Sequence, residues 1–265
     1  MSQCLRFERF FLNDDFLIVP STNGNDTFTE GKWDYKIDFL KAYEYEDEET
    51  WEDEHWLLVH RIEEAAKGIL LEGASLCNAQ SNLNMDQVYE TAGLLISITN
   101  ATDCTEILKF CLHLYTRDGF LSKLINKILR GGDISKATTL GPFCSILNSS
   151  FRLLNTYKYD GIVYRGLLLD EEQLKRYQQA IGTHQQWNSF ISTSKNRVVA
   201  SVYGNTLFII TFYNSPYTYG LDISSFSQFP DEEEVLIQPG RTFCIQEIIF
   251  NNADDKYNVY IRVCF

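Results

Sequence analysis

The stretch GIVYRG at residues 161–166 decides the fold, because the chain changes there from a helical to a strand-forming pattern. Its β-branched and aromatic residues favour a strand, and the same composition returns in the sequence that follows. Further strands are predicted over residues 187–193, 207–213, 233–237, 242–250 and 257–265, with one short helix over 171–181. The C-terminal part of the chain is therefore expected to be mostly β-sheet.

Upstream of this stretch, hydrophobic residues recur at helical spacing. Leu58, Ile62, Ala65 and Ile69 are four, three and four residues apart, which places them on one face of a helix. Further helices are predicted over residues 85–98, 105–114, 118–130 and 140–154. A block of helices followed by a block of strands predicts an α+β fold rather than a doubly wound sheet.

The first 55 residues carry the weakest pattern. Residues 20–31 are rich in Ser, Thr, Asn and Gly, which predicts a loop. Residues 44–54 are mostly acidic, and such a run is usually a solvated face. An acidic docking surface is the alternative interpretation of that run.

Composition limits the partners and the compartment. The formal net charge of -13 makes nucleic acids and anionic membrane surfaces poor partners. No run of about 18 apolar residues occurs, so no transmembrane helix is expected. The seven Cys residues form no CxxC pair, which indicates reduced thiols in a reducing compartment. Because the N-terminus also lacks the apolar stretch of a signal peptide, we expect a cytoplasmic protein, with secretion as an effector as the alternative. We also expect a monomer.

Three common site patterns fail in this sequence. Gly31-Lys32 resembles the end of a phosphate-binding loop, but Asp26 and Trp33 stand where that motif needs Gly and Ser or Thr. No Gly-x-Gly-x-x-Gly fingerprint of a dinucleotide-binding fold occurs. His55 and His60 are five residues apart and lie outside any His-Glu-x-x-His motif, so no metal is expected.

Three short segments at predicted strand ends stand out instead. Tyr164-Arg165-Gly166 and Ser192-Thr193-Ser194 each end a predicted strand, and Glu232-Glu233-Glu234 leads into another. In this order, Arg, Ser-Thr-Ser and Glu-x-Glu resemble the signature of arginine-specific mono-ADP-ribosyltransferases, a family of vertebrate ectoenzymes and bacterial toxins. The resemblance covers about residues 110–265, with Gln238 in the place of an often-seen Pro.

The resemblance implies a fold and a reaction. The fold is a helical N-terminal lobe followed by two packed, mainly antiparallel sheets, with NAD in the cleft between. The reaction cleaves nicotinamide from NAD and attaches the ADP-ribose to an arginine of a target protein. Residues 106–265 would form the catalytic core, and residues 1–105 a helical lobe or extension of unknown role. Because NAD is an anion, local basic groups would hold it against the net charge of -13.

The acidic segment offers two carboxylates with different roles. Cleavage of NAD develops positive charge on the ribose, and Glu234, directly before an apolar strand, is the candidate to stabilise that charge. Strand residues two apart share a face, so Glu232 is expected about 7 Å from Glu234 while Glu233 points elsewhere. Glu232 would orient the acceptor guanidinium and draw off its proton, since the resemblance links Glu at this position with arginine. The alternative register pairs Asp231 with Glu233.

Four further residues are candidates for the NAD site. Arg165 would hold the NAD phosphates with its planar fork of donors, whereas a surface ion pair is the alternative. Gly166 would let the nicotinamide amide approach the backbone. Ser192 would donate a hydrogen bond that holds Glu234 in place. Tyr203 would stack on the nicotinamide ring by resemblance, with a core Tyr as the alternative.

The last candidates lie on a predicted helix and on a loop. Asn126 and Arg130 resemble residues that contact the adenosine or phosphate side of NAD, with a helix surface as the alternative. Phe226 and Phe229 precede the acidic segment, in a stretch that resembles the loop that recognises the acceptor protein. The alternative for both aromatic side chains is a loop anchor tucked into the core.

Two rival functions remain beside arginine-specific transfer. The same cleft would serve an NAD glycohydrolase if water were the acceptor, and Glu232 argues against that hypothesis. A catalytically silent NAD-binding module is the other rival, which the joint presence of Arg165, Ser192 and Glu234 argues against.

Overall fold

The computed structural model describes residues 38–44, 54–79, 83–212, 217 and 219–264, together with the backbone of 17–18. The loop predicted at 20–31 and most of the acidic run at 44–54 lie outside the described residues. The chain divides into two compact units, each considered by itself: a helical unit of residues 37–157 and 225–230, and a sheet unit made of the remainder. The domain boundary predicted at residue 105 stays a prediction.

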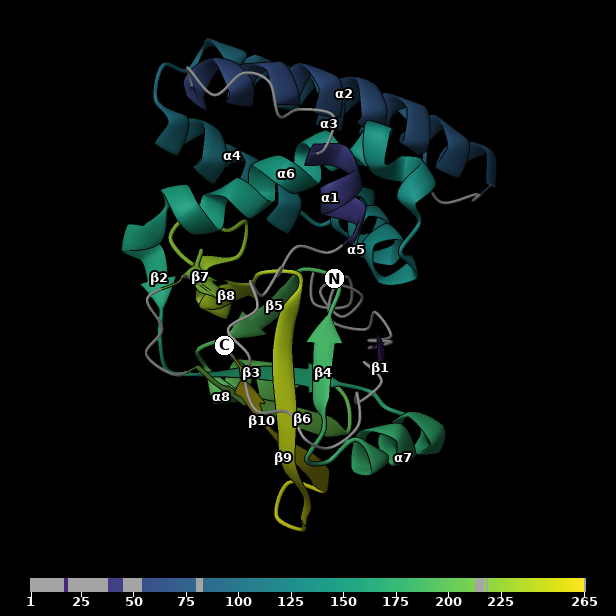
Figure 1. Cartoon of the computed structure of the whole chain (residues 1–265), viewed down its shortest axis with the longest axis vertical. Coiled ribbons are helices and arrows are strands. Elements are labelled where there is room, and N and C mark those ends of the chain that lie inside the picture. The colour runs from purple at the N-terminus through teal and green to yellow at the C-terminus, as the bar shows by residue number, and fades with distance from the viewer. Residues whose placement is uncertain are drawn as a thin grey trace, which may run out of the picture. The chain divides into compact units, whose positions relative to one another are not determined.

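The helical unit contains the helices predicted from the hydrophobic spacing (Figure 1). Its α-helices are α1 (Asp38–Glu44), α2 (Glu54–Ala79), α3 (Met85–Ser97), α4 (Cys104–Thr116), α5 (Phe120–Gly131) and α6 (Ala137–Leu153). The short 3-10 helices η2 (Ile98–Asn100), η3 (Ile134–Lys136) and η4 (Asn155–Tyr157) connect or follow them.

Local signals explain where these helices begin and end. The Asn84 side chain accepts a hydrogen bond from the Gln87 backbone N–H, and the Asn84 backbone N–H donates to the Gln87 side-chain oxygen, so a capping box starts α3. Asp103 caps α4 by accepting from the Thr105 backbone. The helix α5 stops at Gly132, whose φ of 62° suits glycine.

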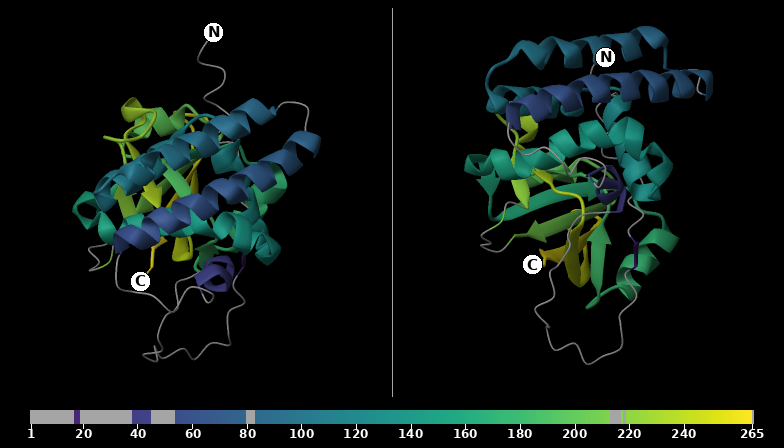
Figure 2. Two further views of the ribbon diagram at one scale, coloured as in Figure 1. Left: turned by 90° about the horizontal axis from the view of Figure 1, so that it is seen from above. Right: turned by 45° about the horizontal axis from the view of Figure 1, so that its top comes forward.

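The core of the helical unit follows the predicted helix face. Leu58, Ile62, Ala65 and Ile69 are at most 3% exposed, so the face predicted for α2 is the buried one. Figure 2 shows α2 and α3 lying side by side, and α2 also packs on α6. At the α2–α6 contact a Cβ on Gly68 would come within 1.7 Å of the Thr139 carbonyl oxygen, so this helix crossing requires glycine.

Among the described residues, the sheet unit holds ten strands in one hydrogen-bonded order, β1-β4-β9-β10-β6-β3-β5-β8-β7-β2. Only the β10–β6 pair is parallel among these pairings. The strands are β1 (Leu17–Ile18), β2 (Lys158–Tyr159), β3 (Ile162–Leu167), β4 (His184–Trp187), β5 (Ile191–Ser194), β6 (Thr206–Thr211), β7 (Gly220–Asp222), β8 (Glu234–Ile237), β9 (Arg241–Asn251) and β10 (Lys256–Val263). The helices α7 (Glu171–Gln179) and α8 (Arg197–Ser201) and the 3-10 helix η5 (Pro230–Glu232) complete the elements.

The strands β3 and β5 have the shortest pairing of the sheet, because they pair at one position, Tyr164 with Ser194. The strands on either side of this junction nevertheless share one hydrophobic core. Val163 and Phe243 come from one side of the junction, and Ile191 and Val235 from the other. The prediction of an α+β fold with two packed, mainly antiparallel sheets is confirmed, and the single β3–β5 pair joins the two sheets into one hydrogen-bonded order.

One predicted strand is wrong. The stretch 187–193 forms two strands, because β4 ends at Trp187 and pairs with β9, whereas β5 begins at Ile191 and pairs with β8. Trp187 stacks on Phe243 with ring centroids 4.0 Å apart, and its carbonyl accepts from the Gly240 backbone, so it stays with β9. The chain crosses between the two groups at 188–190, where no Gly or Pro marks the break.

Candidate active site

Arg165, Ser192 and Glu234 lie on three adjacent strands of the sheet unit, β3, β5 and β8. The Ser192 hydroxyl donates a hydrogen bond to the Glu234 carboxylate. Arg165 Nη1 donates to the Ser192 carbonyl oxygen at 2.7 Å. All three side chains are buried, with exposed fractions of 5%, 7% and 1% in chain order. The structure therefore brings together the three polar residues that the sequence motifs single out.

Burial raises the energetic cost of a charge on Glu234. A buried carboxylate without hydrogen bonds is costly, and the Ser192 hydroxyl supplies a donor to Glu234. Main-chain pairing holds both ends of that bond, since Ser194 is opposite Glu234 and Ser192 is opposite Leu236. The Glu234 carboxylate is thus fixed on rigid backbone, in an environment where a charge acts more strongly than in water.

The acidic segment differs from the strand that was predicted. Glu232 ends the 3-10 helix η5, and Glu233 adopts a left-handed conformation with φ of 47° before β8 begins at Glu234. The prediction that Glu232 shares a strand face with Glu234 is therefore wrong, because Glu232 precedes the strand. The expected separation of about 7 Å stays a prediction. Glu232 and Glu234 are nonetheless buried, while Glu233 is half-buried and Asp231 is exposed.

Position 166 requires glycine for a steric reason that the sequence alone does not reveal. A Cβ at this position would lie 2.1 Å from the Ala200 carbonyl oxygen and 2.4 Å from that of Tyr203. The segment from α8 to Tyr203 therefore packs directly on the backbone of β3. Tyr203 itself is 7% exposed, as in its core-residue alternative, and its stacking role stays a prediction.

Residues 105–263 of the 265 match the family model described as NAD:arginine ADP-ribosyltransferase. The chain belongs to this family. NAD is accordingly its co-substrate, and ADP-ribosyl transfer is its class of reaction.

Solved structures show the same transferase fold. ADP-ribosyltransferase HopU1 of Pseudomonas syringae pv. Tomato DC3000 is 22% identical with a TM-score of 0.53, over 60% of this chain and 77% of that one. The type III effector XopAI from Xanthomonas axonopodis pv. citri is 18% identical with a TM-score of 0.53, over 76% of this chain and 88% of that one. ADP-ribosyltransferase Vis is 20% identical with a TM-score of 0.50, over 64% and 79%. No curated protein sequence matches the chain.

The two helix candidates of the transferase belong to the helical unit. Asn126 on α5 is buried, and its Nδ2 donates to the Tyr115 hydroxyl at 2.8 Å. Its Oδ1 is buried without a hydrogen-bond partner among the described residues. Arg130 is half-buried in the last turn of α5. Their contacts with NAD stay predictions.

The loop candidates Phe226 and Phe229 also belong to the helical unit. His113 Nδ1 lies 3.0 Å from the Phe226 carbonyl oxygen, and the Gln228 backbone donates to Thr116 Oγ1 at 2.8 Å, so the loop is tied to α4 at two points. The Phe226 ring meets the Tyr157 ring edge-on, with centroids 5.4 Å apart. These contacts are those of a loop anchor, although Phe226 and Phe229 are each only half-buried.

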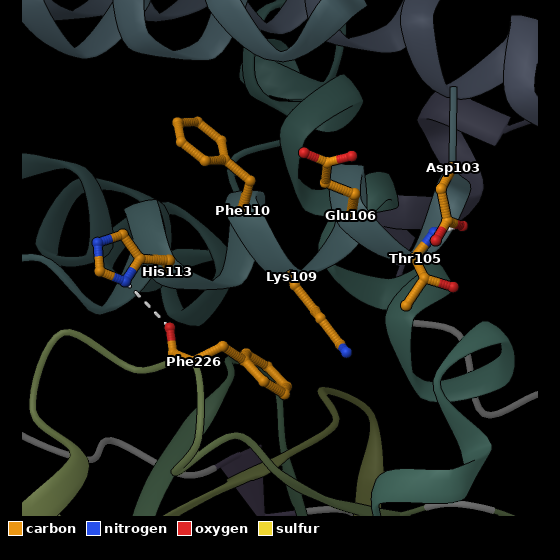
Figure 3. Close-up of a pocket in the computed structure, with 7 residues that line it drawn as sticks. All are labelled: Asp103, Thr105, Glu106, Lys109, Phe110, His113 and Phe226. Carbon is orange, nitrogen blue, oxygen red and sulfur yellow. Dashed lines mark hydrogen bonds between the residues drawn. The ribbon is translucent and has the colours of Figure 1, made fainter. Parts of the chain in front are cut away.

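The anchored loop borders a pocket on α4 that sequence reasoning missed. Figure 3 shows the Phe226 ring and the Lys109 side chain on the same side of this pocket, which has a volume of about 470 Å³. Lys109 Nζ donates to the Tyr157 hydroxyl at 2.6 Å and lies 5.9 Å from the centre of the Phe226 ring. Helical spacing places Lys109 and His113 on one face of α4, but only the fold brings residues 225–230 to that face.

Two expected absences concern metals and membranes. Within the described ranges, no group of three or more His, Cys, Asp and Glu side chains has an arrangement that could hold a metal ion. Among the helices that the structure describes, none has the length and apolar character needed to cross a membrane.

Proposed function

We propose that the chain is an NAD:protein-arginine mono-ADP-ribosyltransferase. The observation that carries the proposal is the buried Glu234 carboxylate, which accepts a hydrogen bond from the Ser192 hydroxyl. Arg165 donates a hydrogen bond to the carbonyl oxygen of the same Ser192. Within a family that uses NAD, a fixed carboxylate of this kind suits the stabilisation of positive charge on the ribose. Glu234 is accordingly the catalytic residue of the proposal.

Arg165 is proposed to hold the phosphates of NAD. Its guanidinium is fixed by the hydrogen bond that Nη1 donates to the Ser192 carbonyl oxygen. The net charge of -13 makes such a local cation necessary, because NAD carries negative charge into an unfavourable overall field. The proposed contact uses the planar fork that distinguishes arginine from lysine. Gly166, Tyr203, Asn126 and Arg130 remain further proposed contacts of NAD.

Glu232 is proposed to select arginine as the acceptor. Glu232 is 6% exposed, and burial strengthens the attraction of its carboxylate for a cationic guanidinium. An incoming arginine is protonated and therefore a poor nucleophile, so a neighbouring carboxylate that orients it and accepts its proton would assist transfer. Phe226 and Phe229 are proposed to meet the target protein.

The cellular setting is also a proposal. The cysteines at positions 77, 104, 111, 144, 244 and 264 are free thiols, in keeping with a cytoplasmic enzyme. The negative net charge supports a protein target over a nucleic acid or a membrane. We expect a monomer, which light scattering on the purified protein would test.

The deciding experiment measures nicotinamide release and ADP-ribose transfer together. The purified protein is incubated with labelled NAD, with and without agmatine as a small guanidine acceptor, and Glu234→Gln serves as the inactive control. Label on agmatine that depends on Glu234 is the expected result. Equal nicotinamide release with and without agmatine, and no labelled agmatine, would identify an NAD glycohydrolase instead. NAD binding without any nicotinamide release would identify a silent binding module.

A further inference from the structure

Glu233, between the two carboxylates of the proposed site, has an unusual backbone. Its φ of 47° lies in the left-handed region, which a residue with a Cβ adopts at a steric cost. Among the described residues, only Glu233 and Asp255 do so without being glycine. Surrounding contacts must therefore hold the conformation at Glu233.

Two neighbouring residues supply these contacts. The Lys195 backbone N–H donates to the Glu233 carbonyl oxygen at 3.1 Å. Asn196 Nδ2 donates to the Glu233 carboxylate, at 3.1 Å from Oε1. Both bonds join the turn before β8 to the chain that leaves β5, so the turn is attached to the strand that also carries Ser192.

Asn196 is itself held in place by its other atoms. Its Oδ1 accepts from the Val198 backbone at 3.0 Å and so caps α8, with Val199 at 3.4 Å. Its own N–H donates to Ser194 Oγ at 2.9 Å. A side chain fixed at this many points presents its Nδ2 in one direction, towards Glu233.

We propose that Asn196 is a positioning residue that sets the acceptor carboxylate Glu232 through Glu233. The inference rests on the proposed function. Glu234 is fixed independently by Ser192 and by the pairing of β8 with β5, whereas Glu232 precedes the strand. The direction of the chain from Glu234 back to Glu232 depends on the conformation of Glu233, which Asn196 holds through the Glu233 carboxylate while the Lys195 N–H binds the Glu233 carbonyl oxygen. Glu233, the middle residue of the acidic motif, therefore fixes the position of Glu232 through its contact with Asn196.

This arrangement predicts that loss of the Asn196–Glu233 hydrogen bond impairs transfer to the acceptor selectively. Asn196→Asp keeps the size of the side chain and its ability to cap α8, but it places a second carboxylate against that of Glu233. Agmatine modification should fall roughly tenfold in kcat/KM, because a hydrogen bond to a charged group is lost and a like-charge contact replaces it. NAD hydrolysis by water should stay within about twofold, because Glu234 is undisturbed.

The pH dependence of the variant separates positioning from structural damage. Two facing carboxylates raise the pKa of one of them, so at low pH they share a proton and the hydrogen bond re-forms. The transfer defect of Asn196→Asp should therefore shrink as pH falls and deepen as pH rises. Wild-type protein measured over the same range provides the reference.

A second substitution provides the matched control and the rescue. Glu233→Gln alone retains an oxygen that accepts from Asn196, so transfer should stay near that of wild type. Combined with Asn196→Asp it reverses donor and acceptor, because the new amide donates to the new carboxylate. Recovery of agmatine modification in the double variant, with no change in hydrolysis, is the expected result.

Other outcomes overturn the inference in distinguishable ways. Normal transfer by Asn196→Asp would show that the contact sets nothing, while the proposed function stands. An equal loss of transfer and hydrolysis that Glu233→Gln does not rescue would show that Asn196 serves only the fold of α8. Wild-type protein that hydrolyses NAD without modifying agmatine would remove the proposed function and this inference together.

Discussion

The two carboxylates proposed for the site lie two residues apart in sequence but on different kinds of backbone. Glu234 begins β8, receives the Ser192 hydroxyl and pairs opposite Ser194. Glu232 ends a 3-10 helix, before a residue with φ of 47° that side-chain and backbone contacts hold. The group proposed to stabilise charge thus stands on a strand paired on both sides, whereas the group proposed to bind the acceptor precedes that strand.

The difference indicates how one fold can keep its NAD chemistry while its acceptor changes. A strand with neighbours on both edges tolerates little movement, so substitutions in the turn need not disturb Glu234. The turn depends on a few contacts and can change with them. Breaking each region separately should therefore give different losses of function.

The largest effect is expected from Glu234→Gln. The amide keeps the shape of the carboxylate but removes the charge that stabilises the ribose. Both agmatine modification and NAD hydrolysis should fall about a hundred- to a thousandfold, which is typical when one preorganised electrostatic group is lost. Both rates are measured on the same preparation, with circular dichroism to confirm the fold. Intact hydrolysis would show that the charge on the ribose is stabilised elsewhere.

Glu232→Gln should produce a selective loss. Agmatine modification should fall about a hundredfold, as for the loss of a group that accepts a proton in the transition state. Hydrolysis should remain largely intact, because water needs no guanidinium site. If this variant instead abolishes hydrolysis while Glu234→Gln spares it, the two carboxylates have been assigned in the wrong order.

Arg165→Lys tests the strand side of the comparison through NAD binding. Lysine keeps the charge but loses the planar fork, so KM for NAD should rise roughly tenfold or more, with a smaller change in kcat. Hydrolysis and transfer should be affected equally, since both need NAD. Thermal unfolding serves as the control for the buried bond to Ser192, and an unchanged KM would contradict the proposed phosphate contact.

Ser192→Ala should weaken both reactions less than the loss of Glu234. The substitution removes one hydrogen bond to the carboxylate and leaves the carboxylate charge in place. A hydrogen bond of this kind is worth about 1.5 kcal/mol, or roughly tenfold in rate. Steady-state kinetics of hydrolysis gives the comparison directly. A loss larger than that of Glu234→Gln would mean that the hydroxyl, and not the carboxylate, acts on the substrate.

The sequence predicts the strand side of this comparison better than the turn. Arg165, Ser192 and Glu234 could be found because each adjoins an apolar stretch that predicts a strand, within an ordered set of motifs. The conformation of Glu233 could not, because three consecutive Glu residues contain no Gly or Asn to mark a left-handed turn. One of the two contacts that hold it comes from Asn196, 37 residues away in the sequence, and only the pairing of β5 with β8 brings the two residues together.

The smallest effect is expected from Asp222→Asn, beside the Lys195 that contacts Glu233. Lys195 Nζ donates to Asp222 Oδ2 at 2.6 Å, and Ser224 donates to Oδ1. Burial alone would raise the pKa of Asp222, but the hydrogen bonds from Lys195 and Ser224 outweigh it and lower that pKa below its usual range. The folded state therefore favours the ionised carboxylate.

The sign of the pH effect follows from that lowered pKa. The ion pair contributes stability at pH values above the unfolded pKa of about 3.9, and this contribution is lost as pH falls through the folded pKa. Asp222→Asn should thus lower the free energy of unfolding by about 1 kcal/mol or less at pH 7, and the difference should shrink below about pH 4. Urea unfolding across this range measures it. The ratio of transfer to hydrolysis should not change, because Lys195 contacts Glu233 through its backbone and not through the paired ammonium. A changed ratio would mean that the turn is held by the whole Lys195–Asp222 pair, and would extend the adjustable region from Glu233 to β7.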